Sequence, residues 1–235
     1  MALENAPAQT RIARIQERIS KAEQQFGQPA GSVRLLAVSK KKPASEIRAT
    51  FAAGQRAFGE NYAQEAISKI TELDPLDIQW HFIGPIQSNK TRLIAEHFSW
   101  VHSVDRLTIA ERLSRQRSAD LPPLNICLQV NVSNEPTKSG VTLDGGLASL
   151  SALASSVAEL PHIRLRGLMA IPVASRELSA QRKPFLVLRE VLEKLKAEGL
   201  DLDTLSMGMS DDMEAAIAEG ATIVRIGTAI FGPRG

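Results

Sequence analysis

A lysine stands at the end of a short apolar segment near the start of the chain. Residues 33–39 are mostly apolar or small and predict a buried strand, and Lys40 follows them directly. Lysine is rarely buried without a partner or a purpose, so a lysine at this position can present its amine to a pocket. The run Lys40-Lys41-Lys42 is also typical of a solvated basic face, and the segment alone leaves this alternative open.

Two later segments carry groups that suit an anion. Ser210 directly precedes a predicted helix, where free backbone N–H groups point at an anion, and Gly227 and Thr228 end the last predicted strand. A glycine lets the backbone approach a ligand closely, and threonine adds a hydroxyl. An ordinary helix N-cap at Ser210 explains the first segment equally well, with the acidic residues at 211–212 complementing the helix dipole.

The last predicted strand also carries an arginine. Period-two alternation places Val224 and Ile226 on one face of this strand and Arg225 on the other. If the two apolar residues face helices, Arg225 points away from them, toward the interior of the sheet assembly. A buried guanidinium needs an acceptor, and an internal salt bridge to a distant carboxylate is the alternative to a ligand.

An amine and an anion-binding group together suit an aldehyde that carries a phosphate. Pyridoxal phosphate, held by a lysine Schiff base and by phosphate contacts, is one such compound. A sugar-phosphate aldolase needs the same two elements, so this chemistry does not choose between them.

Strand and helix patterns alternate along nearly the whole chain. Strands are predicted at 33–39, 57–61, 78–83, 100–104, 125–132, 164–170, 204–209 and 222–228. Helices are predicted between them at 44–53, 62–73, 89–98, 107–116, 147–159, 184–198 and 211–219, with a further amphipathic helix at 11–26. This alternation predicts a parallel sheet, and eight units in 235 residues favour a closed (β/α)8 TIM barrel. A doubly wound open sheet is the alternative.

A barrel would gather the candidate residues at one end. Active sites of such barrels lie at the carboxyl ends of the strands, which is where we expect Lys40, Asn61, Ser210, Arg225, Gly227 and Thr228 to stand. The chain ends seven residues after the last predicted strand, which leaves no room for an eighth outer helix, and we expect the N-terminal helix to take that place. No linker divides the chain, so we expect a single domain over residues 1–235.

Composition restricts the class of protein. Lys and Arg number 28 against 26 Asp and Glu, and this balance gives no electrostatic footprint for nucleic acid or an anionic membrane. The single cysteine, Cys127, excludes an internal disulfide and paired-cysteine metal sites, and the four histidines lack metal-ligand spacing. No signal peptide or membrane span is evident. We therefore expect a soluble, cytoplasmic, metal-free protein, and a monomer.

A series of motifs resembles the pyridoxal phosphate homeostasis proteins, the YggS/PROSC-type family. The motifs occur in the family's order and extend over nearly the whole chain, so the resemblance is highly specific. They are Leu36–Lys40, Phe58–Tyr62, His81–Lys90, Val130–Ser133, Lys138–Gly140, Arg166–Met169, Ser206–Asp211, Arg225–Thr228 and Phe231–Gly232.

The resemblance implies a barrel related to the N-terminal domain of alanine racemase, of fold type III among pyridoxal phosphate proteins. It implies that the cofactor is pyridoxal 5'-phosphate and that Lys40 carries it as a Schiff base. The other cofactor-binding residues follow in three groups: Ser210, Gly227 and Thr228 around the phosphate, Arg225 near the pyridine nitrogen, and Asn61 in the pocket wall.

The residues favour a carrier over an enzyme. Arg225 only donates hydrogen bonds, so beside the pyridine nitrogen it would keep that nitrogen unprotonated and make the cofactor a poor electron sink. Racemisation also needs a second acid or base on the opposite face of the substrate, and the only tyrosine, Tyr62, follows strand two directly. We predict intracellular buffering or delivery of the cofactor, with apo pyridoxal phosphate enzymes as recipients and no catalytic residues. A single-domain amino-acid racemase is the alternative, and a class I aldolase is a third interpretation.

Overall fold

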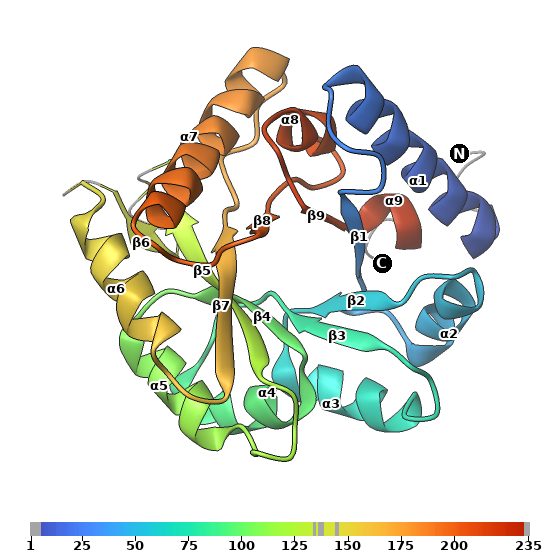
Figure 1. Cartoon of the computed structure of the whole chain (residues 1–235). Helices are drawn as coiled ribbons and strands as arrows, with labels where there is room; N and C mark the ends of the chain where they lie inside the picture. Colours follow the sequence, from blue (N-terminus) through green and yellow to red (C-terminus); the bar gives the residue numbers. More distant parts are fainter. Residues whose placement is uncertain (1–5, 134, 136–138, 144–145, 233–235) are drawn as a thin grey trace.

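The structure, a computed structural model, describes residues 6–133, 135, 139–143 and 146–232. Lys138, which belongs to one of the motifs of the resemblance, lies outside the described residues. Figure 1 shows a ring of strands with helices around it, and the helices at the two ends of the chain lie side by side.

Eight parallel strands close into a barrel. They are β1 (Arg34–Val38), β2 (Ala57–Glu60), β3 (Gln79–Phe82), β4 (Trp100–Val104), β5 (Leu124–Asn131), β7 (Ile163–Met169), β8 (Thr204–Ser206) and β9 (Ile223–Ile226). The order is β4-β3-β2-β1-β9-β8-β7-β5, and pairing of β4 with β5 closes the ring. The predicted closed barrel is therefore confirmed, and the open sheet is excluded.

The helices follow the strands and cover the outside of the barrel. They are α2 (Ala44–Ala52), α3 (Ala63–Glu72), α4 (Thr91–His97), α5 (Leu107–Gln116), α6 (Ala148–Ala158), α7 (Leu178–Ala197), α8 (Met213–Ala218) and α9 (Thr228–Phe231), with a 3-10 turn η1 (Ser88–Lys90) before α4. The N-terminal helix α1 (Ala8–Gln25) packs against α2, α8 and α9, as expected for an extra helix that fills the last gap (Figure 1).

Four details of the prediction were wrong. Helix α7 begins at Leu178 and contains Pro184, because burial of its apolar face outweighs the one backbone hydrogen bond that proline removes. Strand β8 ends at Ser206, because Gly208, with φ +91°, turns the chain. A single helical turn, α9, does follow the last strand. The two-residue strand β6 (Val141–Thr142), which pairs with β5, was not predicted.

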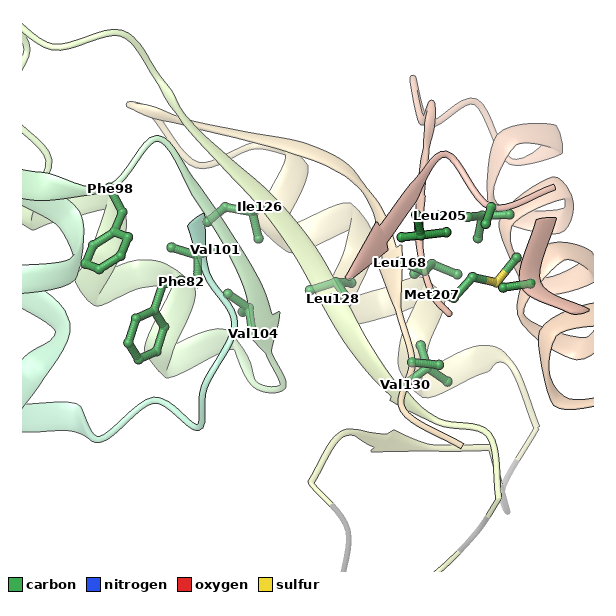
Figure 2. Packing of buried hydrophobic residues seen from close by; sticks show 14 of the residues in the cluster. Phe82, Phe98, Val101, Val104, Ile126, Leu128, Val130, Leu168, Leu205 and Met207 are labelled. Carbon is green, nitrogen blue, oxygen red and sulfur yellow. The ribbon is translucent and has the colours of Figure 1, made fainter. Parts of the chain in front are cut away.

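The apolar core has two layers. The larger layer lies between the strands and the helices, and Figure 2 shows part of it, including Phe82 against Phe98. The smaller layer lies inside the barrel and includes Leu36, Trp100 and Cys127. Val224 and Ile226 belong to the outer layer and Ile223 to the inner one, so the predicted alternation of the last strand is confirmed.

Neither a membrane-spanning helix nor a metal-binding group of side chains occurs among the residues that the structure describes. None of their helices is both long and apolar enough to cross a membrane. Within the same ranges, no group of three or more histidine, cysteine, aspartate or glutamate side chains is placed to hold a metal ion.

Candidate functional site

A cavity of about 210 Å³ lies at the carboxyl ends of β1, β2, β8 and β9. Its lining includes all six residues that the sequence singled out: Lys40, Asn61, Ser210, Arg225, Gly227 and Thr228. The remaining lining is mostly apolar, with Ile83, Ile171 and Met209 among it. The fold thus brings together groups that are up to 188 positions apart in the chain (40 to 228), because the ends of neighbouring parallel strands meet at one rim.

Lys40 is half-buried and stands in the turn between β1 and α2. The next residue, Lys41, has φ 60°, and the backbone N–H of Lys42 donates to the carbonyl oxygen of Ser39 at 3.0 Å, so the chain turns there. Lys42 instead donates from Nζ to the carbonyl oxygen of Phe231 in α9, at 2.7 Å. Of the three consecutive lysines, Lys40 is the one that lines the cavity, and the basic run is therefore not a uniform solvated face.

A group of charged side chains, which we call the ionic cluster (Glu60, Glu65 and Lys69), fixes the residues on both sides of Lys40. Lys69 Nζ contacts Glu60 Oε1 at 2.8 Å and Glu65 Oε1 at 2.6 Å, and it donates to the carbonyl oxygen of Ser39 at 2.9 Å. Glu60 Oε1 also accepts from the Ser39 hydroxyl, and Glu65 accepts from the backbone N–H of Lys41. The cluster therefore positions Lys40 through its two neighbours.

Glu60 is the most constrained member of this cluster. Its side chain is fully buried, and burial raises the pKa of the carboxyl group, while Lys69 and the Ser39 hydroxyl oppose that shift. Its second oxygen, Oε2, has no hydrogen-bond partner among the described residues. Lys69 therefore stabilises the charged form of the buried Glu60 carboxyl group.

Asn61 follows β2 and lines the cavity beside Ile83. Its side-chain oxygen Oδ1 is buried and has no hydrogen-bond partner in the described part of the chain. Gly84 leaves room for the backbone of Asn61, because a Cβ at position 84 would collide with the Asn61 carbonyl group. A buried acceptor without a partner, held against the cavity, suits a ligand that donates a hydrogen bond.

Arg225 is 4% exposed and makes three hydrogen bonds inside the barrel. Nη1 donates to the backbone oxygen and to the hydroxyl of Ser206, at 2.5 and 2.9 Å, and Nη2 donates to the backbone oxygen of Ala170 at 2.9 Å. Burial lowers the pKa of Arg225 to about 10, and the nearby Asp212 opposes that shift, so the guanidinium is charged at neutral pH. Among the described residues its acceptors are carbonyl and hydroxyl oxygens, so the alternative of an internal salt bridge to a distant carboxylate is wrong there.

Ser206 also contacts His102, which contacts His81, inside the barrel. Together with Gln79 we call these residues the neutral chain (Gln79, His81, His102 and Ser206). His81 is a buried core histidine that is hydrogen-bonded to its neighbours.

The loop between β8 and α8 brings Ser210 to the cavity. Helix α8 begins at Met213, and Asp212 rather than Ser210 occupies the N-cap position, so the interpretation of Ser210 as a helix cap was wrong. Asp212 accepts the backbone N–H of Met209 at 2.6 Å, which directs this carboxylate to the loop itself. Arg18 of α1 donates to the Ser210 carbonyl and pairs with Glu214, which ties the loop to the N-terminal helix.

Gly227 and Thr228 line the cavity after β9, the strand next to β8. They stand between β9 and the single turn α9, and a Cβ at position 227 would lie 3.4 Å from the carbonyl oxygen of Val38. The first backbone N–H groups of a helix have no acceptor within it, and those of Thr228 and Ala229 have none among the described residues. Hydroxyl and backbone donors therefore meet here on the rim.

A second cavity, of about 290 Å³, adjoins the first and shares Asn61, Ile83 and Ile171 with it. Gln129 and Asn131 of β5 contribute to its lining. The space beside Lys40 and Asn61 thus continues toward β5.

Sequence reasoning missed several residues that shape the site. Ile83, Ile171 and Met209 line the cavity, but single apolar residues at strand ends carry no chemical signal. His102 was also missed. Side chains alternate between the two faces of a strand, so His102 on β4, next to the outward-facing Val101, is expected to point into the barrel. That signal was available in the sequence.

Comparison with known proteins places this barrel among its relatives. A family model described as the alanine racemase N-terminal domain matches residues 11–235. A pyridoxal phosphate homeostasis protein from Pseudomonas aeruginosa is 62% identical over 95% of this chain and 94% of its own. The structure of PipY from Synechococcus elongatus with pyridoxal phosphate bound is 42% identical, covers 91% of this chain and 100% of PipY, and has a TM-score of 0.78. The chain belongs to the family of pyridoxal phosphate homeostasis proteins.

A more distant likeness concerns the fold alone. Alanine racemase from Corynebacterium glutamicum is 17% identical, with a TM-score of 0.66 over 94% of this chain and 60% of the racemase. The resemblance proposed from the motifs is thus confirmed at the level of the family and of the barrel.

Proposed function

We propose that this protein binds pyridoxal 5'-phosphate in the cavity at the carboxyl end of its barrel and acts in the homeostasis of that cofactor. One observation carries the proposal: a lysine, a buried arginine and a set of hydroxyl and backbone donors line a single cavity. The family supports it, since relatives are named for this role and PipY was solved with the cofactor bound. We further propose that one domain over residues 1–235 supplies the whole site.

The donor set of the cavity fits each part of this cofactor. Lys40 provides the amine for the aldehyde, and the unpartnered Asn61 Oδ1 suits a donor on the ring or its substituents. Ser210, Thr228 and the backbone near Gly227 offer the hydroxyl and N–H donors that a phosphate needs. The apolar side chains of Ile83 and Ile171 suit the faces of an aromatic ring.

When bound, pyridoxal phosphate supplies an aldehyde that bonds reversibly to an amine. The side chains around it then have separate tasks. Lys40 holds the aldehyde end, while Ser210 and Thr228 hold the phosphate end. Arg225, charged and limited to donating, would offer its remaining N–H groups to the ring nitrogen of the cofactor and would keep a proton off it. An unprotonated ring nitrogen withdraws electrons weakly, so the residues favour retention of the cofactor over its use.

The same residues support a carrier without robust catalysis. Racemisation requires an acid or base on each face of the substrate, and Tyr62, the only tyrosine, is 49% exposed and absent from the cavity lining. We expect exchange of the α-hydrogen of amino acids in deuterated water to stay below about 1 s⁻¹, the low end of typical enzymes. Faster exchange would establish the racemase alternative. We propose apo enzymes that use this cofactor as the recipients.

Absorption spectroscopy tests the proposed binding. Purified protein mixed with pyridoxal phosphate should develop a band of the lysine-bound cofactor that differs from the band of the free compound. Lys40→Ala should lack the band, whereas Lys21→Ala, which removes an exposed lysine of α1, should keep it. A band of equal strength in Lys40→Ala would overturn the assignment of Lys40.

A further inference from the structure

Inside the barrel, the neutral chain forms a continuous row of hydrogen bonds that ends at Arg225. Arg225 Nη1 lies 2.9 Å from Ser206 Oγ, and Ser206 Oγ lies 2.7 Å from His102 Nδ1. His102 Nε2 lies 2.9 Å from His81 Nδ1, and His81 Nε2 lies 3.1 Å from Gln79 Oε1. The residues come from four different strands, so no local motif requires this arrangement.

The neutral chain, together with Arg225, extends from one end of the barrel to the other. Arg225 lines the proposed cofactor cavity, whereas Gln79 begins β3 and lines a separate cavity of about 550 Å³ at the amino ends of the strands. Between them, His102 is fully buried and His81 is 2% exposed. The His81 ring stacks on Trp100, with the ring centres 5.5 Å apart and the planes 4° from parallel, which fixes its orientation.

The acceptor Gln79 at one end of the neutral chain, together with the neutral histidine rings, determines the direction of the hydrogen bonds between its members. Arg225 can only donate, so Ser206 Oγ accepts from it, and Gln79 Oε1 can only accept, so His81 Nε2 carries a hydrogen. Burial lowers the pKa of His81 to about 3 and that of His102 well below its usual value, so both rings are neutral. His81 Nδ1 then accepts from His102 Nε2, and His102 Nδ1 accepts from the Ser206 hydroxyl.

One consequence concerns the charge of Arg225. Because the Ser206 hydroxyl donates to His102, its oxygen lone pairs are free to face the guanidinium. In the reverse direction the same oxygen would accept from both His102 and Arg225 and would use both of its lone pairs. Two of the five N–H groups of Arg225, on Nε and Nη2, make no hydrogen bond within the described residues. These are the groups that remain for a ligand.

We propose, on the basis of the function proposed above, that His102 and His81 are positioning residues for the cofactor. They orient the Ser206 hydroxyl as an acceptor for Arg225 and thereby hold the remaining N–H groups of Arg225 toward the cofactor ring. Their role is neutral and directional, and they transfer no proton.

The tautomers of the two histidines test this proposal without any cofactor. In the full-length protein labelled with ¹⁵N, both rings should carry their hydrogen on Nε2 at neutral pH. Gln79→Leu removes the acceptor at the end of the chain from an exposed position, so this variant should fold, and it should change the tautomer populations of His81. Hydrogen on Nδ1 of either ring in the unaltered protein would overturn the proposal.

Binding of the cofactor provides the second test. His102→Phe keeps an aromatic ring beside Trp100 but removes both nitrogens, and it should weaken cofactor binding roughly tenfold, about the effect of one hydrogen bond, and shift the absorption band. His102→Gln, which retains a donor and an acceptor, should recover part of both effects. Gln79→Leu should shift the band in the same direction, whereas Gln16→Leu, in the same amino-end cavity, should not.

The outcomes separate this proposal from the proposed function. If the unaltered protein binds no pyridoxal phosphate, the proposed function fails. The tautomer measurement still decides the direction of the hydrogen bonds in the neutral chain. If the protein binds the cofactor and His102→Phe and Gln79→Leu leave both the affinity and the band unchanged, the positioning role is wrong and the proposed function stands.

Discussion

Two buried polar groups support Lys40 and Arg225 at the cavity, and they do so by different means. The ionic cluster holds Lys40 through charged contacts to the backbone and hydroxyl of its neighbours Ser39 and Lys41. The neutral chain holds Arg225 directly, through the Ser206 hydroxyl. One group contains two carboxylates and an ammonium, and the other contains no charge.

The difference follows from what each side chain must do. In the proposed function Lys40 bonds to the cofactor, and its support accordingly acts on the turn that carries it and leaves the amine at the cavity. Arg225 has to remain charged inside the barrel. A second cation beside it would destabilise that charge, whereas neutral histidines provide oriented acceptors without one. Placement of a reactive group and stabilisation of a fixed charge thus require different surroundings.

The largest expected effect comes from disrupting the ionic cluster. Lys69→Met leaves Glu60 buried without its cation and should lower the free energy of unfolding by about 3–5 kcal/mol, as measured by urea denaturation. Because the pKa of Glu60 is already raised, its carboxyl can take up a proton in the variant, so the loss should be larger at pH 8 than at pH 5.

Two further variants sharpen this prediction. Lys21→Met removes an exposed lysine that pairs with Glu17 on α1, and it should leave the unfolding curve unchanged. Adding Glu60→Gln to Lys69→Met removes the unpaired charge and should recover part of the lost stability. A Lys69→Met protein as stable as the original at pH 8 would show that the cluster does not stabilise the turn at Lys40.

The neutral chain should make the protein sensitive to acid. The folded-state pKa of His81 is about 3, below its ordinary value of 6.5, so the unfolded chain binds more protons between these values. The contribution of such a histidine to the free energy of unfolding is therefore fully present above pH 6.5. It is lost as the pH drops toward 3, by up to about 1.4 kcal/mol per pH unit for each histidine. His102, whose pKa is also lowered, should contribute in the same direction.

Urea denaturation between pH 7 and pH 4.5 measures this slope. His102→Gln removes one of the two buried histidines and should make the slope smaller. His97→Gln removes an exposed histidine at the end of α4, which is not part of the neutral chain, and serves as the control. Equal slopes for His102→Gln and the original protein would contradict neutral buried histidines.

The smallest effect is expected for Ser206→Ala. Arg225 keeps its bonds to the backbone oxygens of residues 206 and 170, so the change should cost only about 1 kcal/mol of stability. The bound cofactor should nevertheless show a shifted band in the same direction as His102→Phe, since both changes remove the oriented acceptor. A shift in the opposite direction would separate Ser206 from the neutral chain.

The sequence predicted the barrel and the cavity better than their supports. The alternation of strands and helices, with inward and outward phases such as that of Val224, Arg225 and Ile226, was enough to place six residues at one rim. The role of those six in cofactor binding stays a prediction. Boundaries failed where a local rule conflicts with tertiary packing, as with Pro184 inside α7.

The supports were not predictable because they depend on contacts between distant strands. Glu60 and Lys69 are nine positions apart but meet beside Ser39, which belongs to another strand–helix unit. His102 and Ser206 are separated by 104 positions and become neighbours only because the sheet closes. A sequence pattern reports which face a residue occupies, but the register across a closed barrel determines which partner it meets there.

Reductive trapping tests most directly whether Lys40 holds the cofactor. The protein is incubated with pyridoxal phosphate and treated with borohydride, which fixes a lysine-bound aldehyde, and the digested peptides are analysed by mass spectrometry. We expect the added mass on the peptide that contains Lys40, and no added mass at that position in Lys40→Arg. Added mass at other lysines with none on Lys40 would contradict this expectation.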